Sequence, residues 1–600
     1  MTTLRIFPGL ATTLALLLAG CGDPEPTTET GDTFTMALDG APATLDPVQA
    51  SSLYANYLVP AIFDTLYAYK YLARPHELEP NLARAMPEVS DDGLTYTVRL
   101  KKGVRFHKDP AFAAKADREV TAHDVVYSIL RHFDPQTRPR GAAFWRDHLV
   151  GVEQWRARGS DYANPPEGLR ALDRYTVRFR LRKPYPQFVY TLALGFAAIV
   201  PRQAVEHYGR RFAVNPVGSG PFMLEDFSTM RAQLRANPEF RSIPFDPAQQ
   251  GYDPETQSGL GIEALAGRSP PFVDRLVVEF INEDAARWAS FTKDNEVQAM
   301  RLPARFFDTV LASREPLRLN DKYADRFHAR AQLEAGFVKV DFNMADPQIG
   351  RSDDPERDRR NRALRCAIRG AFDWRSRKAT FYDNMARIFP GVLPPVTAEF
   401  NPDADRGSVR HDPDRARALL AEHGWDAENL PTLEYGFVSS VQNRQSFEAL
   451  RRDLAAIGYP RDKVQPDAYA NFGAFAKAFR QRNIMMVFSA WTMDYPDAQN
   501  ILQIYYGPNA APGANISNYD NQAYNRLYRQ ATGLPRSPKR SELYRRMNQM
   551  IIDDCVTISG LSRKQVMLWH RDAVFLPDRA FVPGFGLRYA AIRPSSENAD

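Results

Sequence analysis

Cysteine is scarce in this sequence of 600 residues, which holds three. So few cysteines exclude the disulfide framework of a small secreted domain, and their spacing resembles no metal site. Cys366 and Cys555 lie in the body of the chain. They could form a disulfide in an oxidising compartment or remain two buried thiols, and the sequence leaves both readings open. No metal ion and no cofactor is expected.

Long apolar runs are missing beyond the N-terminus. The apolar run at residues 6–18 is shorter than the about 20 residues that span a bilayer. Arg5 precedes it, and Leu18-Ala-Gly-Cys21 follows and resembles the bacterial lipobox, whose cysteine carries a lipid after cleavage. We therefore expect a lipoprotein signal peptide at 1–20, lipid attachment at Cys21 and a polar tether at 21–32. The alternative is an ordinary secretory signal with an incidental cysteine.

A basic stripe is absent too. Lys and Arg number 77 against 72 Asp and Glu, and the two signs alternate along the chain. Nucleic-acid binding needs clustered cations that neutralise phosphates, so nucleic acid is not an expected partner.

Familiar catalytic spacings do not occur. The sequence has no phosphate loop, no His-Glu-x-x-His helix and no Gly-x-Ser-x-Gly elbow. Ser219 lies between two glycines that are flanked by prolines, which suits a rigid turn better than a nucleophile. His107 and His123 are expected to be a surface hairpin residue and a helix-start residue instead of metal ligands. We therefore predict that the protein is not an enzyme.

What the chain does contain is a mixture of strands and helices without an internal repeat. Its length predicts two or three packed units. Residues 96–106 alternate around a Lys-Lys-Gly turn and predict a hairpin, and Thr121 with Asp124 forms a capping box for a helix. Further helices are predicted at 412–424, where Asp412 and Pro413 start the helix and Gly424 ends it, and at 447–457.

The apolar run Ile484-Met-Met-Val-Phe488 predicts a strand that is covered on both faces. The segment Trp491-Thr-Met-Asp494-Tyr-Pro-Asp497 follows its end. Because ligands of α/β sheets gather at the carboxyl ends of such strands, this segment is the first candidate for a binding site.

Several segments together resemble one family, the family 5 extracellular solute-binding proteins of peptide and nickel ABC importers. The most diagnostic stretch is Asp92-Gly-Leu-Thr-Tyr96, followed by Leu100-Lys-Lys-Gly-Val-Arg-Phe-His107. Other matching segments follow in the family's order, at 44–47, 78–83, 121–128, 215–222, 362–373, 412–425 and 491–497. The stretches at 108–119 and 135–172 depart from the pattern as insertions that either form surface loops or shape the mouth of a cleft.

The resemblance implies a fold class: an α/β, two-lobed, periplasmic-binding-protein-like (type II) cleft protein with an extra domain inserted in the first lobe. Mapped onto this chain, the first lobe comprises 33–73, 215–335 and 560–600. The inserted domain comprises 74–214 and the second lobe 336–559.

The resemblance also implies a site. Asp494 occupies the position where peptide-binding relatives carry the aspartate that holds the ligand's ammonium group, and Trp491, Thr492 and Tyr495 are expected to line the same pocket. The alternative for Asp494 is a cap on the turn before Pro496, and Asp497 is expected to be such a cap. Dipeptide-binding relatives hold the ligand's carboxylate with an arginine, but residues 435–442 contain none. Oligopeptides are therefore favoured over dipeptides.

The expected function is that of a substrate-binding lipoprotein of an ABC importer. It would be a monomer on the periplasmic side of the cell envelope, held to the membrane through its lipid alone, with the importer's permease and ATPase subunits as partners. One alternative keeps the fold but changes the cargo to a nickel chelate, haem, an opine or an oligosaccharide. A second alternative is a secreted hydrolase.

Overall fold

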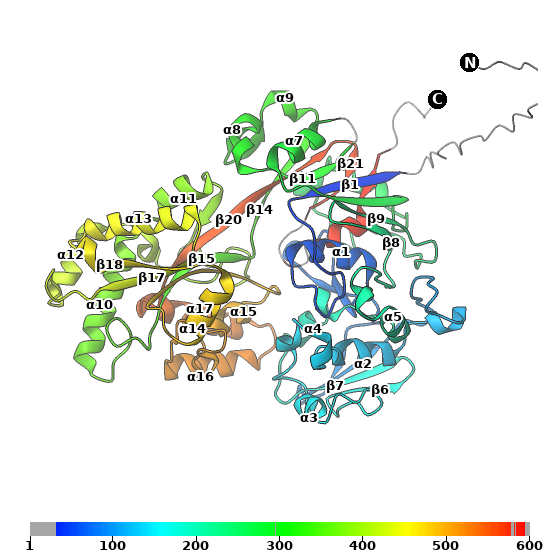
Figure 1. The fold of residues 1–600 in the computed structure, drawn as a ribbon, viewed down its shortest axis with the longest axis horizontal. Helices are drawn as coiled ribbons and strands as arrows, with labels where there is room; N and C mark the ends of the chain where they lie inside the picture. Colours follow the sequence, from blue (N-terminus) through cyan, green and yellow to red (C-terminus); the bar gives the residue numbers. More distant parts are fainter. Residues whose placement is uncertain (1–31, 294–295, 578–580, 582–583, 594–600) are drawn as a thin grey trace, which may run out of the picture.

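The computed structural model describes residues 32–293, 296–577, 581 and 584–593. The signal peptide, Cys21 and nearly all of the tether lie outside these residues. The described chain forms two bodies side by side, which Figure 1 shows with the central segment of the chain on the left and both terminal segments on the right. We call the left body, which begins near residue 336 and ends near residue 561, the second lobe, and the right body the first lobe.

One long sheet runs through both lobes. Its strands, in spatial order, are β18 (Val464–Tyr469), β17 (Leu433–Val438), β19 (Met486–Thr492), β15 (Gly336–Phe342), β20 (Thr557–His570), β11 (Ala299–Arg301), β1 (Thr33–Leu38), β10 (Arg275–Phe280), β9 (Arg231–Ala236) and β8 (Phe222–Phe227). Two more strands, β14 (Phe327–Leu333) and β16 (Ala386–Ile388), also pair with β20.

The strand β20 joins the two lobes. Residues 557–561 of β20 pair with β15 in the second lobe, and residues 564–570 pair with β14 in the first. The chain also passes from β14 to β15 beside it, through Glu334 and Ala335. Figure 1 shows β20 and β14 running together from one body to the other. Two neighbouring crossings are the geometry of a hinge.

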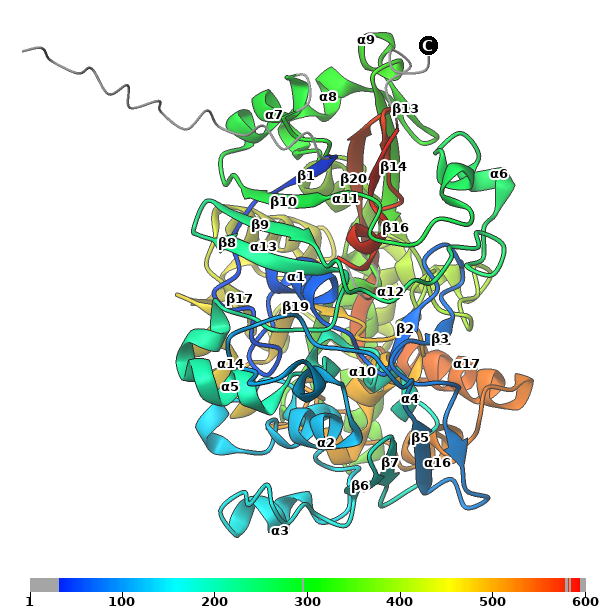
Figure 2. The same cartoon turned by 90° about the vertical axis from the view of Figure 1, so that its right-hand side faces the viewer.

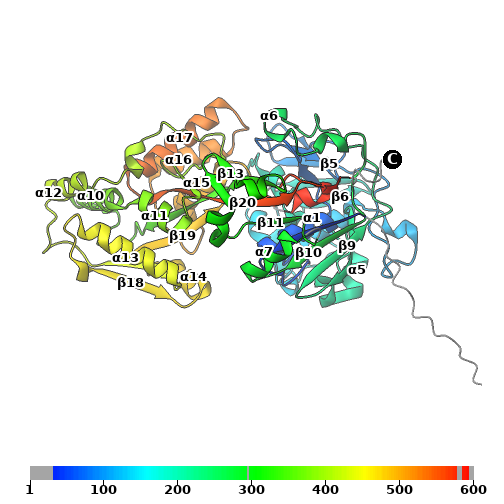
Figure 3. The ribbon, with the colours of Figure 1, turned by 90° about the horizontal axis from the view of Figure 1, so that it is seen from above.

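Helices cover the sheet of the second lobe. They are α10 (Pro355–Ala371), α11 (Trp374–Tyr382), α12 (Pro413–Glu422), α13 (Val441–Ala455), α14 (Phe472–Arg480), α15 (Gln499–Leu502), α16 (Gln522–Thr532) and α17 (Pro538–Asp553). Seen from above in Figure 3, α14 lies on the side of its lobe that is nearest to the first lobe.

The first lobe holds the remaining helices and the smaller sheets. The helices are α1 (Leu53–Ile62), α2 (Ala122–Leu130), α3 (Val152–Ala157), α4 (Phe188–Thr191), α5 (Arg202–Tyr208), α6 (Pro254–Gln257), α7 (Asp284–Thr292), α8 (Phe307–Val310) and α9 (Asp321–Ala324). A four-stranded sheet runs in the order β4 (Glu88–Val89), β5 (Thr95–Arg99), β7 (Thr176–Arg180) and β6 (Leu169–Asp173). Two-stranded sheets are formed by β2 (Tyr67–Tyr69) with β3 (Leu78–Pro80), β12 (Leu311–Arg314) with β13 (Leu317–Leu319), and β21 (Ala573–Val574) with β22 (Ala591–Ile592).

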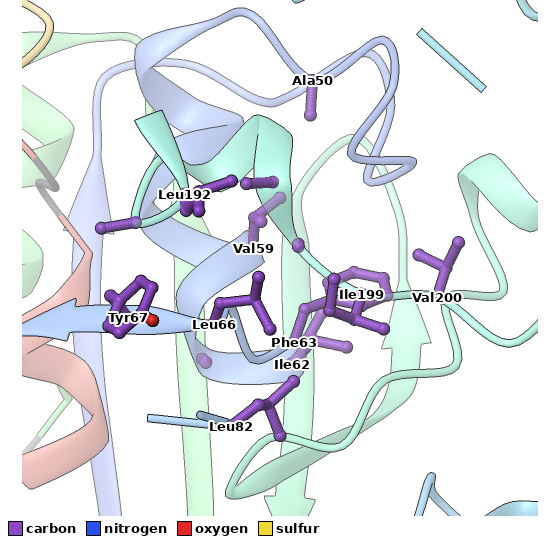
Figure 4. Packing of buried hydrophobic residues seen from close by; sticks show 14 of the residues in the cluster. Ala50, Val59, Ile62, Phe63, Leu66, Tyr67, Leu82, Leu192, Ile199 and Val200 are labelled. Carbon is purple, nitrogen blue, oxygen red and sulfur yellow. The ribbon is translucent and has the colours of Figure 1, made fainter. Parts of the chain in front are cut away.

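Each lobe has its own apolar core. Figure 4 shows part of the first, where Val59 and Ile62 of α1 pack with Leu192, Ile199 and neighbouring residues of the 74–214 segment. Figure 2 shows the four-stranded sheet and α2 at the end of the molecule away from β1 and β20. Apolar packing against α1 therefore holds residues 74–214 to the first lobe. That these residues form an inserted domain remains our proposal.

The predicted hairpin at 96–106 is wrong. The strand β5 pairs with β4 and with β7, more than 70 residues further along the chain, and Arg105 forms only an isolated bridge with Glu119. The capping box is confirmed, since the backbone N–H of Thr121 donates to the Asp124 carboxylate at 2.8 Å at the start of α2.

His107 is buried, so its assignment as a surface residue is wrong. Its ring contacts the turn predicted around Ser219: Nε2 lies 3.0 Å from the Gly220 carbonyl, and the Gly218 N–H donates to Nδ1 at 3.3 Å. A Cβ on Gly218 would lie 2.0 Å from the Ile62 carbonyl oxygen, so only glycine fits against the end of α1. Ser219 donates to the Asp64 carboxylate at 3.0 Å and lies in a bend of the chain, which agrees with the predicted turn.

The two predicted helices of the second lobe are present as α12 and α13. Asp412 caps α12 by accepting from the Arg415 N–H, and Gly424 after its end has a φ of +68°. The strand predicted at 484–488 lies further along the chain: β19 begins at Met486 and ends at Thr492, so it includes Trp491. Pairing with β15 over residues 486–492 extends the strand beyond the apolar run.

Cys366 and Cys555 form a disulfide that joins α10 to the end of α17. Among the described residues, no helix is both long and apolar enough for a membrane span.

Candidate functional site

The strand β19 carries the predicted site segment to the border between the lobes. It runs parallel to β17 and antiparallel to β15, with Thr492 opposite Gly336. A Cβ on Gly336 would lie 2.1 Å from the Trp491 carbonyl oxygen, so glycine is required where the chain enters the second lobe. Asp494 follows two residues after the strand.

One edge of β19 is open near its carboxyl end. The neighbouring β17 pairs only with Met486 and Val487, whereas β15 pairs with the whole of β19 on the other edge. Among the described residues, positions 488–492 therefore have no strand partner on the β17 side. An open edge of this kind presents backbone N–H and C=O groups that can take up an extended chain.

Asp494 is a half-buried carboxylate without a cationic partner among the described residues. Its Oδ2 accepts a hydrogen bond from Asn500 Nδ2 at 2.9 Å, and its backbone N–H donates to Asn500 Oδ1 at 3.2 Å. Burial raises the pKa of Asp494, and the hydrogen bond from Asn500 opposes that rise only in part. Among the described residues, the Asp494 side chain accepts a hydrogen bond from this side-chain amide and from no backbone N–H.

The other predicted site residues separate into two groups. Trp491 is half-buried and donates from Nε1 to the same Asn500 oxygen at 3.2 Å, while Thr492 is exposed at the strand end. Tyr495 is buried and turns toward the first lobe. Asn500 thus links Trp491 to Asp494 through hydrogen bonds. The sequence did not indicate this role of Asn500.

Asp497 is a structural cap, as predicted. Its carboxylate accepts from the Gln499 N–H at 3.0 Å and pairs with buried Arg540 at 2.8 Å.

Tyrosines form a contact between the lobes, which we call the tyrosine seam (Tyr185, Tyr190 and Tyr495). The Tyr185 and Tyr495 hydroxyls are 2.7 Å apart, and the Tyr190 and Tyr495 rings stack with centroids 5.8 Å apart. Burial raises the pKa of Tyr185 above its usual value, and the charges of Asp497 and Asp494 raise it further. Asp494 therefore lies close enough to act on a first-lobe side chain.

The 135–172 insertion supports this seam. His148 stacks on Tyr185 with ring centroids 4.0 Å apart, and burial lowers the pKa of His148 to about 4. The 108–119 insertion lies elsewhere and packs through buried Arg118, which pairs with Glu239 at 2.8 Å.

A pocket of about 390 Å³ lies beside the open edge of β19. We call it the β19 pocket; it is lined by Val338, Phe381, Tyr382, Val438, Gln442, Asn443, Ser446, Phe472, Phe475, Phe488, Ser489, Ala490 and Arg563. Its residues come from elements far apart in the chain, so no sequence pattern indicated the pocket. The one local signal was the pair of phenylalanines, 472 and 475, which the structure places in the first turn of α14.

The pocket reaches the hinge through Arg563. The guanidinium pairs with Glu334 at 2.7 Å, and the Glu334 N–H donates to the Arg563 carbonyl at 2.9 Å. Each residue belongs to one of the two crossings between the lobes.

In the described part of the chain, no group of three or more His, Cys, Asp or Glu side chains could hold a metal ion.

Comparison with known proteins places this geometry in context. A family model described as bacterial extracellular solute-binding proteins, family 5 Middle, matches residues 77–513. The dipeptide-binding protein of Pseudomonas aeruginosa is 25% identical over 615 residues, which cover 98% of this chain and 97% of that protein. Heme-binding protein A of Haemophilus influenzae is 23% identical over 486 residues, which cover 79% of this chain and 77% of that protein.

Among solved structures, the periplasmic binding protein DppA of Helicobacter pylori in complex with the peptide STSA superposes with a TM-score of 0.66. The two are 21% identical, and the match covers 94% of this chain and 98% of that one. The likeness confirms the expected fold class, a two-lobed α/β periplasmic-binding-protein-like fold.

Proposed function

Because the chain belongs to the family 5 bacterial extracellular solute-binding proteins, we propose that it captures peptides between its lobes and presents them to the permease and ATPase of an ABC importer. It acts as a monomer and catalyses no reaction. The observation that carries the proposal is the half-buried Asp494 carboxylate, which has no cationic partner among the described residues and lies beside an open strand edge.

A free peptide N-terminus supplies what Asp494 lacks. Burying an ionised carboxylate is costly unless a counter-charge and hydrogen bonds compensate it, and an ammonium group provides both. Asn500 donates to the carboxylate and is itself held by Trp491, so the ammonium meets an oriented partner.

The open edge of β19 supports binding of an extended peptide backbone. Main-chain hydrogen bonds to residues 488–492 would hold any sequence, since every residue offers the same backbone groups. The open edge is several residues long, which favours oligopeptides over dipeptides; residues 435–442 also lack an arginine that would fix a dipeptide's carboxylate.

Lobe closure converts binding into a signal. The two crossings allow hinge motion, and a peptide that contacts both lobes favours the closed form by its differential affinity. The importer then distinguishes loaded from empty protein by shape.

The substitution Asp494→Asn tests the site. We expect it to weaken binding of free-amine peptides by well over tenfold, because truncating one partner of a buried charge pair costs about 2–5 kcal/mol. Calorimetric titration of matched free and N-acetylated peptides measures the effect, and exposed Asp414→Asn on α12 is the control. Equal affinity of the native protein for both peptides would remove Asp494 from this role.

The proposed location is the periplasmic side of the cell envelope, with the protein anchored by a lipid on Cys21. The lipobox-like residues before Cys21 and the disulfide between Cys366 and Cys555 support export, since disulfides persist in oxidising compartments. Cys21→Ser should release the protein from membranes and abolish incorporation of labelled fatty acid. Unchanged membrane attachment in that variant would contradict the lipid anchor.

Haem is the second candidate cargo, because heme-binding protein A is among the relatives. A thermal-shift comparison of hemin with tripeptides to hexapeptides separates the two, since a true ligand stabilises the folded state by mass action. If hemin alone raised the melting temperature, the peptide proposal would fail.

A further inference from the structure

The β19 pocket has an aromatic lining without a free charge. Phe381, Phe472, Phe475 and Phe488 line it together with Tyr382. Its one cationic side chain, Arg563, is already neutralised by Glu334 at 2.7 Å. Such a lining favours an apolar or aromatic guest over a charged one.

Phe472 is unusually exposed for a phenylalanine. It is 66% exposed at the first position of α14, whereas Phe475, one turn later, is 2% exposed. Their rings meet at 6.5 Å in an edge-to-face arrangement. The exposed ring of Phe472 packs against the buried ring of Phe475, and an aromatic ring of a bound ligand could also pack against Phe472.

One polar atom in the pocket lacks a partner. The Ser489 Oγ is buried and makes no hydrogen bond within the described structure. The amides around it are engaged: Asn443 donates to the Val438 carbonyl at 2.8 Å, and Gln442 donates to the Phe381 carbonyl at 3.1 Å. A buried hydroxyl normally has a partner, so Ser489 indicates a guest with a hydrogen-bonding atom.

The pocket also lies at a defined distance from Asp494. Phe488, Ser489 and Ala490 precede Asp494 by four to six residues, and the ladder continues past the strand through the Met493 N–H to the Ala335 carbonyl at 2.7 Å. A peptide whose ammonium reaches Asp494, and whose first residue lies opposite Thr492 at the end of the open edge, runs antiparallel to β19 and places its third to fifth residues opposite Ala490, Ser489 and Phe488.

From this arrangement we infer that the β19 pocket holds one aromatic side chain of the bound peptide, at the third to fifth position, and that Ser489 Oγ bonds its polar atom. The inference rests on the proposed function and adds a substrate class, peptides that carry a tyrosine or tryptophan at the third to fifth position.

A positional scan of alanine pentapeptides tests the inference. A single tyrosine, phenylalanine or lysine is placed at each position in turn, and affinities are measured by calorimetric titration of the full mature chain. Tyrosine at one position from the third to the fifth should bind at least about tenfold more tightly than alanine there, because a ring leaves water. Lysine should gain nothing, and tyrosine at the first position should gain little.

Two variants assign the effect to the pocket. Phe472→Ala should reduce the ratio of tyrosine to alanine affinity about fivefold, whereas Met230→Ala, which removes a 72% exposed side chain from the first lobe, should leave that ratio unchanged. Ser489→Ala should remove the advantage of tyrosine over phenylalanine.

The outcomes separate this inference from the proposed function. Peptides that bind with affinities independent of side chain and position would overturn the inference and leave the proposed function standing. Loss of the tyrosine preference in Met230→Ala but not in Phe472→Ala would also overturn it. If no pentapeptide bound, both the proposed function and the inference would fall.

Discussion

The decisive side chain at the residue scale is Asp494, whose carboxyl is desolvated before any ligand arrives. A carboxyl with a raised pKa costs the folded protein stability above its unfolded pKa, because the charged form loses water without gaining a cation. In the proposed complex, the ammonium group of the peptide would offset that cost. Asp494→Asn should therefore leave the ligand-free protein as stable as the native one, or more stable, in thermal melts at neutral pH.

The raised pKa also predicts how peptide affinity depends on pH. As the pH falls, Asp494 takes up a proton earlier than an ordinary aspartate and then no longer attracts an ammonium group. Affinity for free-amine peptides should thus begin to fall at a higher pH than the usual aspartate range. Titrations from neutral to acidic pH measure this, and the same dependence in Asp494→Asn would contradict the assignment.

Asp64 is the opposite case, a buried carboxylate with two cations. Burial alone would raise its pKa, but Arg241 and Arg588, each 2.7 Å away, hold it well below the usual value. A lowered folded pKa contributes stability above the unfolded pKa, and that stability is lost only as the pH falls through the folded value.

The substitution Asp64→Asn should lower the free energy of unfolding by about 3–5 kcal/mol, because it leaves two guanidinium groups buried without their counter-charge. Urea denaturation measures the loss, and exposed Asp414→Asn should change it by less than about 1 kcal/mol. The partners of Asp64 lie 177 and 524 residues away, so no sequence pattern indicates them.

At the element scale, local signals predicted helices well and strand partners poorly. The cap residues of α2 and α12 act within one turn, and both helices begin where predicted. The partner of β5 is instead decided by packing, because β5 pairs with β7 and not with the nearby residues 104–106 that the sequence predicts. The candidate segment at 491–497 could be proposed from the sequence because it is one continuous stretch, whereas the β19 pocket combines side chains from several elements.

The disulfide between Cys366 and Cys555 links α10 to the end of α17 across 189 residues. Replacing both cysteines by serine should lower the free energy of unfolding by about 3–5 kcal/mol, since the cross-link restricts the unfolded chain. Denaturation with and without reductant measures this. A double variant as stable as the oxidised native protein would show that the bond does not form.

At the scale of the whole molecule, the proposed function depends on how the two lobes approach each other. They are joined by two crossings that Glu334 and Arg563 hold together, and they meet again at the tyrosine seam. A ligand between the hinge and the tyrosine seam would be enclosed only while the tyrosines of the seam are in contact. These contacts should therefore increase the affinity for the ligand, although they do not touch it.

The substitution Tyr185→Phe should therefore weaken peptide binding roughly two- to tenfold, the value of one neutral hydrogen bond. Tyr175→Phe is the matched control, because its hydroxyl donates to Glu119 at 3.0 Å within the first lobe. Titration calorimetry of both variants measures the difference. Equal losses in the two would show that the seam has no part in closure.

The identity of the bound solute tests the central claim most directly. Mass spectrometry of the protein purified without denaturation, and then of the material released from it by acid, reports that identity. The account predicts peptides of three or more residues with unmodified N-termini and an aromatic residue at the third to fifth position. Haem, an opine, a sugar or N-terminally blocked peptides in the released material would contradict it.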